Sequence, residues 1–323
     1  MSPSNIHHLN SALMVISCLV AFFIPFELFL FSYAILGPLH YLTEIGWLHK
    51  KNYFTKGKND FIFLIIGCVL IVYWNYFPIK NYTRTADVLL FCLFLSIVFV
   101  FIKDWLYRWI LILLSVIIIG VLNNSPQYFT WFGIFLPTII HVFIFTWVFM
   151  LYGVIKEKSI PGLISIGVLI LCTVLLFIIQ PTNLIYKVSE YTMKSYGGFS
   201  ELNFRLINFL NLSKLTEVKQ IFTTQVGFVI MRFIAFAYTY HYLNWFSKTS
   251  VIKWHLVPKK TLFITLIIWL LSISIYFYDY TVGLQVLLFL SFLHVFLEFP
   301  LNVMSFTGIG KELSAFNIKK KIN

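Results

Sequence analysis

Long runs of apolar residues follow one another along almost the whole chain. A run of about 20 apolar residues is long enough for a helix to cross the hydrocarbon core of a bilayer. Ten such spans are predicted, at residues 10–24, 26–48, 60–78, 87–102, 106–122, 128–152, 161–180, 220–246, 261–281 and 284–307. The pattern therefore predicts an all-α fold, a polytopic bundle of about ten transmembrane helices.

The polar segments between these spans are short, with the exception of residues 181–219. Within that segment, residues 203–212 have roughly helical apolar spacing, which predicts an interfacial helix on the membrane surface. No change of composition marks a soluble domain, so residues 1–323 are predicted to form a single integral membrane domain. The first ten residues lack the basic segment and cleavage site of a signal peptide, so the first span is expected to be retained.

Composition and charge agree with this reading. Hydrophobic residues make up 60% of the chain and charged residues only 11%, whereas a soluble domain has about 25% charged residues. The net charge of +12 does not indicate a nucleic-acid partner, because the basic residues lie in the short connections, where they act as topology signals. Sixteen of the 24 basic residues fall on the side of the two termini. This bias predicts cytoplasmic termini and a multi-pass protein of the inner (plasma) membrane.

Four histidines interrupt the apolar runs, each on a different span: His40, His141, His241 and His294. In the ten-span topology these four spans cross the membrane in the same direction. A single histidine of this kind is explained by a hydrogen bond to a neighbouring helix. Four of them together favour a metal site, because imidazole is the commonest metal ligand and polar groups inside the hydrocarbon usually mark function.

Two glutamates accompany these histidines. Glu44 follows His40 by four residues, and Glu298 follows His294 by four, so each carboxylate lies on the face of its histidine, about 6 Å nearer the cytoplasm. They can offset the charge of an ion either by accepting the second ring N–H of a ligating histidine or by binding the ion directly. Both are predicted to be needed for catalysis.

The donor set limits the choice of metal. The four cysteines lie singly on spans that carry none of the four histidines, so a thiolate site is not indicated. Imidazole and carboxylate ligands leave iron, zinc, copper or manganese, and redox chemistry on an apolar substrate favours iron.

Other polar residues lie near the histidines in the sequence. Asn302 comes one turn after Glu298, and Asn244 comes one turn after His241. A supporting role at the metal and an ordinary interhelical hydrogen bond are equally open for both asparagines. Arg232 precedes His241 by nine residues, half a turn out of phase, and is expected to face away from the site and to have a structural partner.

The four histidine segments resemble those of the Brp/Blh family, which are membrane β-carotene dioxygenases of bacteria and archaea that make retinal. The first segment is the most similar, with Pro38 before His40 and Glu44 after it. Three features depart from the family pattern. Trp245 stands one turn after His241, where the family usually has a second histidine. The acidic residue that the family usually has after the second histidine segment is replaced near Thr146. Extra spans separate His40 from His141.

The resemblance implies an Fe(II) enzyme that uses O2 to cleave a double bond of a polyene and produces aldehydes such as retinal. The polyene would be a lipid-soluble substrate that enters from the surrounding membrane lipids. Two other classes remain open. Lipid hydroxylases and desaturases usually carry His-x-x-His clusters, which this sequence lacks. A transporter could use the histidines and glutamates as a metal or proton pathway, but histidines on helices of like direction favour a fixed site.

Overall fold

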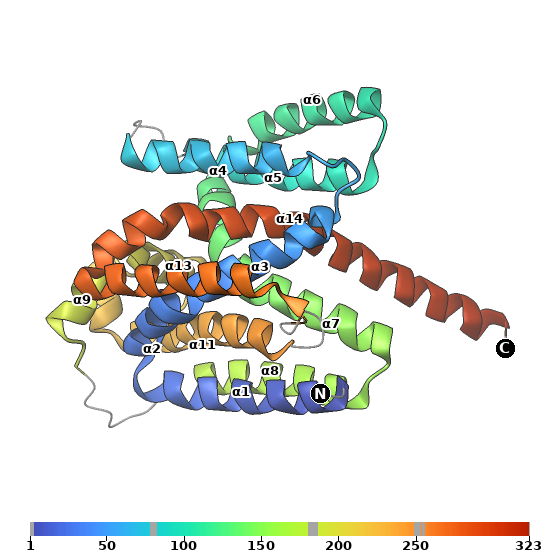
Figure 1. Ribbon diagram of the computed structural model, residues 1–323. Helices are drawn as coiled ribbons and strands as arrows, with labels where there is room; N and C mark the ends of the chain where they lie inside the picture. Colours follow the sequence, from blue (N-terminus) through green and yellow to red (C-terminus); the bar gives the residue numbers. More distant parts are fainter. Residues whose placement is uncertain (1–2, 78–82, 180–186, 249–252, 254–255, 323) are drawn as a thin grey trace. The chain divides into compact units, whose positions relative to one another are not determined.

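The computed structural model describes residues 3–77, 83–179, 187–248, 253 and 256–322, without the side chains of Pro3, Thr83 and residues 315–322 (Figure 1). The described residues form helices and connections, and none of them belongs to a strand. Nine of the helices in this part of the chain are long and apolar enough to cross a membrane. The predicted class, a multi-pass all-α membrane protein, is confirmed.

Nine of the ten predicted spans correspond to these nine helices, and the remaining one corresponds to a shorter helix. The helix in question is α4 (Phe61–Tyr76), which is apolar but has only 16 residues. At 1.5 Å per residue it is about 24 Å long, less than the hydrocarbon thickness of about 30 Å. The first two spans are separate helices, because Pro25 has no N–H to continue the first one and instead begins the second.

The first compact unit consists of residues Met1–His40 and Ser159–Leu287. Its elements are α1 (Pro3–Phe23), α2 (Pro25–Phe31), η1 (Ser32–Leu36), α8 (Ile160–Ile178), α9 (Glu190–Tyr196), η4 (Gly197–Phe199), α10 (Ser200–Phe209), η5 (Val218–Phe222), α11 (Gln225–Ser247) and α13 (Lys259–Tyr278), with the first residues of α3 and α14. Helix α11 is the centre of this unit. It packs against α1, α2, α8 and α10, and it is the most buried of the nine long apolar helices.

The second compact unit consists of residues Tyr41–Lys158 and Leu288–Asn323. It contains most of α3 (Gly37–Lys50) and α14 (Tyr280–Ile322), together with η2 (Asn52–Phe54), α4, α5 (Thr83–Phe101), α6 (Trp105–Leu122), η3 (Phe129–Phe145) and α7 (Thr146–Glu157). Helix α5 packs against α4, α6 and η3. Ala86 and Leu90 of α5 form a core cluster with Ile119 and Tyr128.

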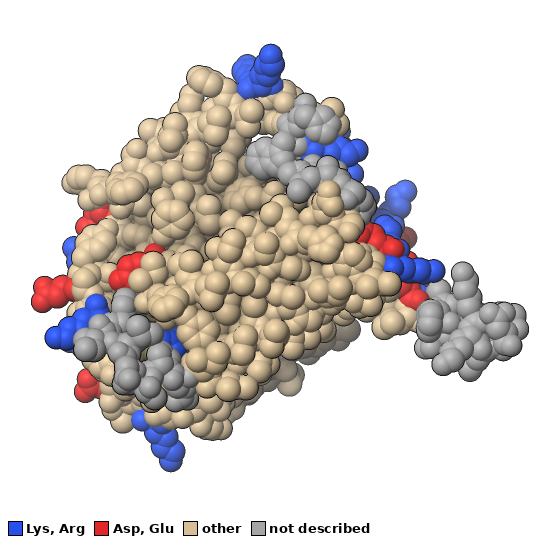
Figure 2. Space-filling model, turned by 90° about the horizontal axis from the view of Figure 1, so that it is seen from below, with Lys and Arg blue, Asp and Glu red and all other residues tan. Residues whose placement is uncertain are grey.

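Much of the surface is apolar, as a lipid environment requires. Only 17% of the most apolar stretch of α6 and 11% of that of α13 is buried. In the face shown in Figure 2, uncharged residues cover the broad central area, and charged residues lie at its margins. Apolar side chains that face outward over whole helices are typical of contact with acyl chains rather than water.

The long connection also contains helices. Residues 181–186 lie outside the described part of the chain, and α9 begins at Glu190. The interfacial helix predicted at residues 203–212 corresponds to α10 (Ser200–Phe209). Its apolar face, with Leu202, Leu206 and Ile207, is buried, and the helix packs against α11.

Candidate functional site

In the second unit, the imidazoles of His141 and His294 meet at close range. His141 lies in the π-helical segment η3 and His294 in α14, and both side chains are almost fully buried. Their Nε2 atoms are 3.0 Å apart, and the ring planes are inclined at 73°. Two of the four histidines predicted to act together are thus in direct contact.

This separation is compatible with two arrangements. An N–H···N hydrogen bond between neutral imidazoles has a similar length. Two nitrogens that bind one ion at about 2.1 Å and subtend about 90° at it are also about 3.0 Å apart. The pair of Nε2 atoms could therefore accept a transition metal without a change in the distance between the two nitrogens.

Glu298 lies on the other side of the His141 ring. Its Oε2 atom is 3.2 Å from Nδ1 of His141. A carboxylate at Nδ1 favours the tautomer with the proton on that nitrogen, and this leaves the lone pair of Nε2 directed at His294. Glu298 therefore has the position of a group that orients a ligating histidine, which was one of the two roles predicted for it. The histidine it contacts is on another helix and not the one four residues earlier in α14.

Tyr41 completes this group in the second unit. Its ring stacks on His294, with centroids 4.0 Å apart and planes inclined at 21°, and it is 2% exposed. Stacking of this kind fixes the plane of the imidazole ring. Sequence reasoning missed Tyr41. Its position directly after His40 was the available signal.

In the first unit, His40 and His241 form the other pair. Their ring centroids are 4.7 Å apart and their planes are inclined at 73°, and both side chains are buried. Three aromatic residues of α11 surround His40, at ring centroid distances of 5.2, 5.7 and 6.4 Å: Tyr242, Trp245 and Phe246. Trp245, which stands where the Brp/Blh pattern has a histidine, thus forms part of the apolar wall around His40.

Irregular helix geometry occurs next to two of the histidines. The π-helical segment η1 (Ser32–Leu36) ends four residues before His40, and His141 lies inside the π-helical segment η3, which also contains Pro137. Hydrogen bonds from residue i to i+5 widen the helix and rotate side chains relative to an α-helix, and such segments are frequent at functional sites. The sequence gives no reliable sign of this register.

The remaining polar residues of the prediction are also buried. Glu44 in α3 is 2% exposed. Nδ2 of Asn302 and Oδ1 of Asn244 are buried without a hydrogen-bond partner among the residues that the structure describes. Buried polar atoms of this kind usually have a partner, so both amides are available to a ligand or a water molecule.

Arg232 has an aromatic partner instead of an acidic one. Its guanidinium lies over the ring of Phe22 in α1, with Cζ 5.0 Å from the centroid. No carboxylate in the described part of the chain forms an ion pair with it, and its Nε and Nη1 atoms have no hydrogen-bond partner there. A cation–π contact with α1 agrees with the expected structural role.

Comparison of the chain with known protein families, curated proteins and solved structures finds no match. The resemblance to the Brp/Blh family therefore stays a prediction.

Proposed function

We propose that this protein is a membrane-embedded, metal-dependent oxygenase in which His40, His141, His241 and His294 hold one iron ion, Fe(II) before reaction. The observation that carries the proposal is the meeting of the His141 and His294 Nε2 atoms at 3.0 Å, with Glu298 at the opposite nitrogen of His141. A carboxylate beside the second ring nitrogen is typical of a ligating histidine.

The burial of all four histidines supports their assignment to one ion. His40, His141, His241 and His294 are each at most 6% exposed, and each lies on a different apolar helix. Polar groups in such helices usually mark a functional site.

The donor set fits iron among the first-row metals. Imidazole nitrogens with a carboxylate beside them suit iron, zinc or copper, and no sulfur ligand is among them. Iron held here would supply the reaction with O2. The chain's own part is to hold the ligands in place, to keep the Nδ1 proton of His141 at Glu298, and to exclude water with aromatic walls such as Tyr41 and Trp245.

The surroundings of the histidines support a lipid-soluble substrate. The rings next to His40 and His294 are those of Tyr, Trp and Phe side chains in apolar helices. Such rings suit an apolar molecule, because no charge of the substrate would have to be desolvated beside them. Together with the family resemblance, this favours a carotenoid or a related isoprenoid, which would be cleaved at a double bond to an aldehyde of the retinal type.

Metal analysis of the purified protein is the direct test. Protein purified in detergent should contain about one iron per chain, and its absorption spectrum should change when O2 is admitted to an anaerobic sample. Protein that is fully folded, carries no transition metal and takes up none from added Fe(II), Zn(II) or Cu(II) would refute the proposed site.

A further inference from the structure

The connection between α3 and α4 carries an unusual density of exposed positive charge. Lys50, Lys51, Lys56 and Lys58 all lie within nine residues and are exposed, and Lys103, in the connection between α5 and α6, is exposed as well. These five lysines are called the basic loop surface below. Two acidic residues lie near it in the sequence: Asp60, which is paired with Arg108, and Asp104, which offsets the charge of one lysine.

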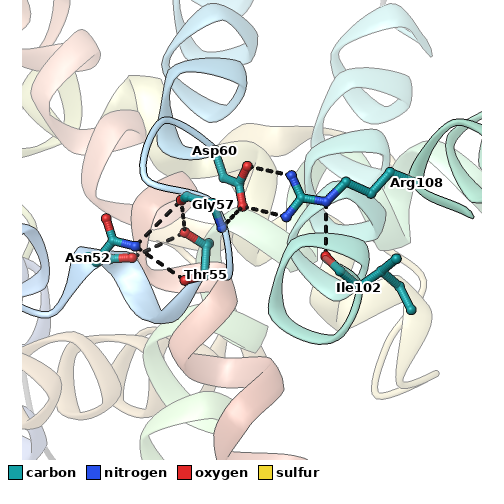
Figure 3. A network of polar contacts seen from close by, with 6 residues as sticks. All are labelled: Asn52, Thr55, Gly57, Asp60, Ile102 and Arg108. Carbon is teal, nitrogen blue, oxygen red and sulfur yellow. Dashed lines mark hydrogen bonds and ion pairs between the residues drawn. The ribbon is translucent and has the colours of Figure 1, made fainter. Parts of the chain in front are cut away.

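Asp60 and Arg108 fix this loop to the start of α6. The guanidinium Nη1 and Nη2 atoms of Arg108 lie 2.7 and 3.0 Å from the two carboxylate oxygens of Asp60, and both residues are buried (Figure 3). Nε of Arg108 donates to the carbonyl of Ile102 at 2.9 Å, and the amide of Gly57 donates to Asp60 at 2.7 Å. Asp60 is thus neutralised by Arg108 and does not offset the charge of the lysines.

Further bonds tie the two connections together. The backbone N–H of Lys56 donates to the carbonyl of Phe99 at 2.8 Å, which brings the loop to the end of α5, four residues before Lys103. The carboxylate of Asp104 accepts from the amides of Leu106 and Tyr107 at 2.9 and 3.3 Å, so this exposed acid serves as the N-cap of α6.

The first half of the loop has a defined but strained shape. Asn52, Tyr53 and Phe54 have φ angles of 49°, 50° and 60°, in the left-handed region that residues with a Cβ disfavour. Tyr53 stabilises this turn. Its ring is buried and stacks on Phe61 with centroids 4.8 Å apart, and its hydroxyl lies 3.2 Å from Nδ1 of His49. Burial raises the pKa of Tyr53, so the phenol stays neutral.

Exposed aromatic residues border the lysines. Trp105, Tyr107 and Trp109, directly after Lys103, are 64%, 61% and 44% exposed, and the two indoles contact each other edge to face. Trp and Tyr side chains concentrate at the headgroup level of a bilayer. Their presence places the basic loop surface at the depth of the lipid phosphates.

We propose that the basic loop surface binds the headgroups of anionic phospholipids. Lysines that serve only to set the orientation of the helices in the membrane need a positive charge, but the segment that carries them needs no fixed conformation. Here the charge is held in a folded loop by a buried ion pair, a left-handed turn and backbone bonds, and it lies beside side chains of the interfacial type. Basic groups at this depth attract anionic lipids. This inference does not depend on the proposed metal site.

Fluorescence quenching by brominated lipids tests the proposal on the full-length protein in nanodiscs. Tryptophan emission is recorded with brominated phosphatidylglycerol diluted into phosphatidylcholine, and with brominated phosphatidylcholine diluted into phosphatidylglycerol. The wild-type protein should select the anionic lipid by roughly tenfold. Lys56→Gln/Lys58→Gln should lose most of this preference. Replacement of both Trp105 and Trp109 by Phe leaves seven of the chain's nine tryptophans, so in that background the effect of Lys56→Gln/Lys58→Gln on the quenching should disappear.

Two controls make the result specific. Lys156→Gln/Lys158→Gln removes the same charge with the same spacing from the exposed end of α7 and should keep the preference. Lys56→Arg/Lys58→Arg keeps the charge and should also keep the preference for the anionic lipid. An equal preference in the wild type and in Lys56→Gln/Lys58→Gln would overturn the proposal. So would an equal loss in the α7 variant, because it would show that net charge alone attracts the lipid.

Discussion

Nδ1 of His141 and Oε2 of Glu298, on two different helices of the second unit, lie 3.2 Å apart. This contact explains why a carboxylate is retained in an apolar helix, where an isolated charge is costly. It also bears on which nitrogen of His141 carries the proton. Because the carboxylate lies beside Nδ1, the proton is favoured on that nitrogen and the lone pair on Nε2, the atom that meets His294.

Replacement of Glu298 by Gln should weaken the metal site without abolishing it. The amide keeps the shape of the side chain but lacks the negative charge that favours the proton on Nδ1 of His141. Loss of such an orienting group typically lowers metal affinity or activity by about 10- to 100-fold. Competition with a chelator, followed by metal analysis, measures the change. Glu312→Gln, farther along α14, is the matched control, and complete loss of metal in Glu298→Gln would instead show that Glu298 binds the ion directly.

Replacement of His141 or His294 by Ala should remove the metal from purified protein. Each substitution deletes one of the two nitrogens that meet at 3.0 Å and leaves a cavity in place of a ring. His8→Ala, at an exposed position of α1, should keep the wild-type content. Full metal content in both site variants, measured on protein with an unchanged helical spectrum, would contradict the assignment.

Glu44→Gln should keep the metal and lose activity. Glu44 was predicted to act near His40, and its burial at 2% exposure shows that it is not a solvated surface acid. An ion that keeps all its histidines should remain bound, whereas a reaction that needs the carboxylate should slow. Metal content and turnover are measured on the same preparation. Loss of the metal itself would show that Glu44 is a ligand.

The ion pair between Asp60 and Arg108 should contribute strongly to the stability of the second unit. Asp60→Asn leaves the Arg108 guanidinium buried without its counter-charge, and breaking a buried pair in this way costs about 3–5 kcal/mol. The thermal unfolding midpoint of the detergent-solubilised protein should therefore fall. Asp60→Asn combined with Arg108→Met removes both charges and should recover most of the loss. A double variant as unstable as the single one would show that the pair is not the source of the effect.

The sequence predicted the helices well because each of them depends on a local property, the length of an apolar run. Only α4, with 16 residues, is shorter than the span predicted at residues 60–78. The break between α1 and α2 was visible as Pro25. These features need no knowledge of which helix packs against which.

The details of the site depend on contacts between helices, which spacing alone does not give. Glu298 was predicted to support a histidine, but only packing shows that the histidine beside it is His141. Tyr41 looked like one of many aromatic residues until its ring was found on His294. The π-helical register around His141 could not be predicted from the sequence either, because the residues of η3 carry ordinary apolar side chains that suit an α-helix equally well.

Expression in cells that make β-carotene tests the substrate. If the apolar wall around His40 admits a polyene from the bilayer, the cells should lose their colour and accumulate an apolar aldehyde or alcohol such as retinal, which chromatography of a lipid extract detects. Cells that express His141→Ala at the same level should keep their carotene. Unchanged carotene in cells whose purified wild-type protein contains iron would reject the carotenoid substrate and leave the metal site standing. The aromatic wall would then have to be tested with other membrane isoprenoids.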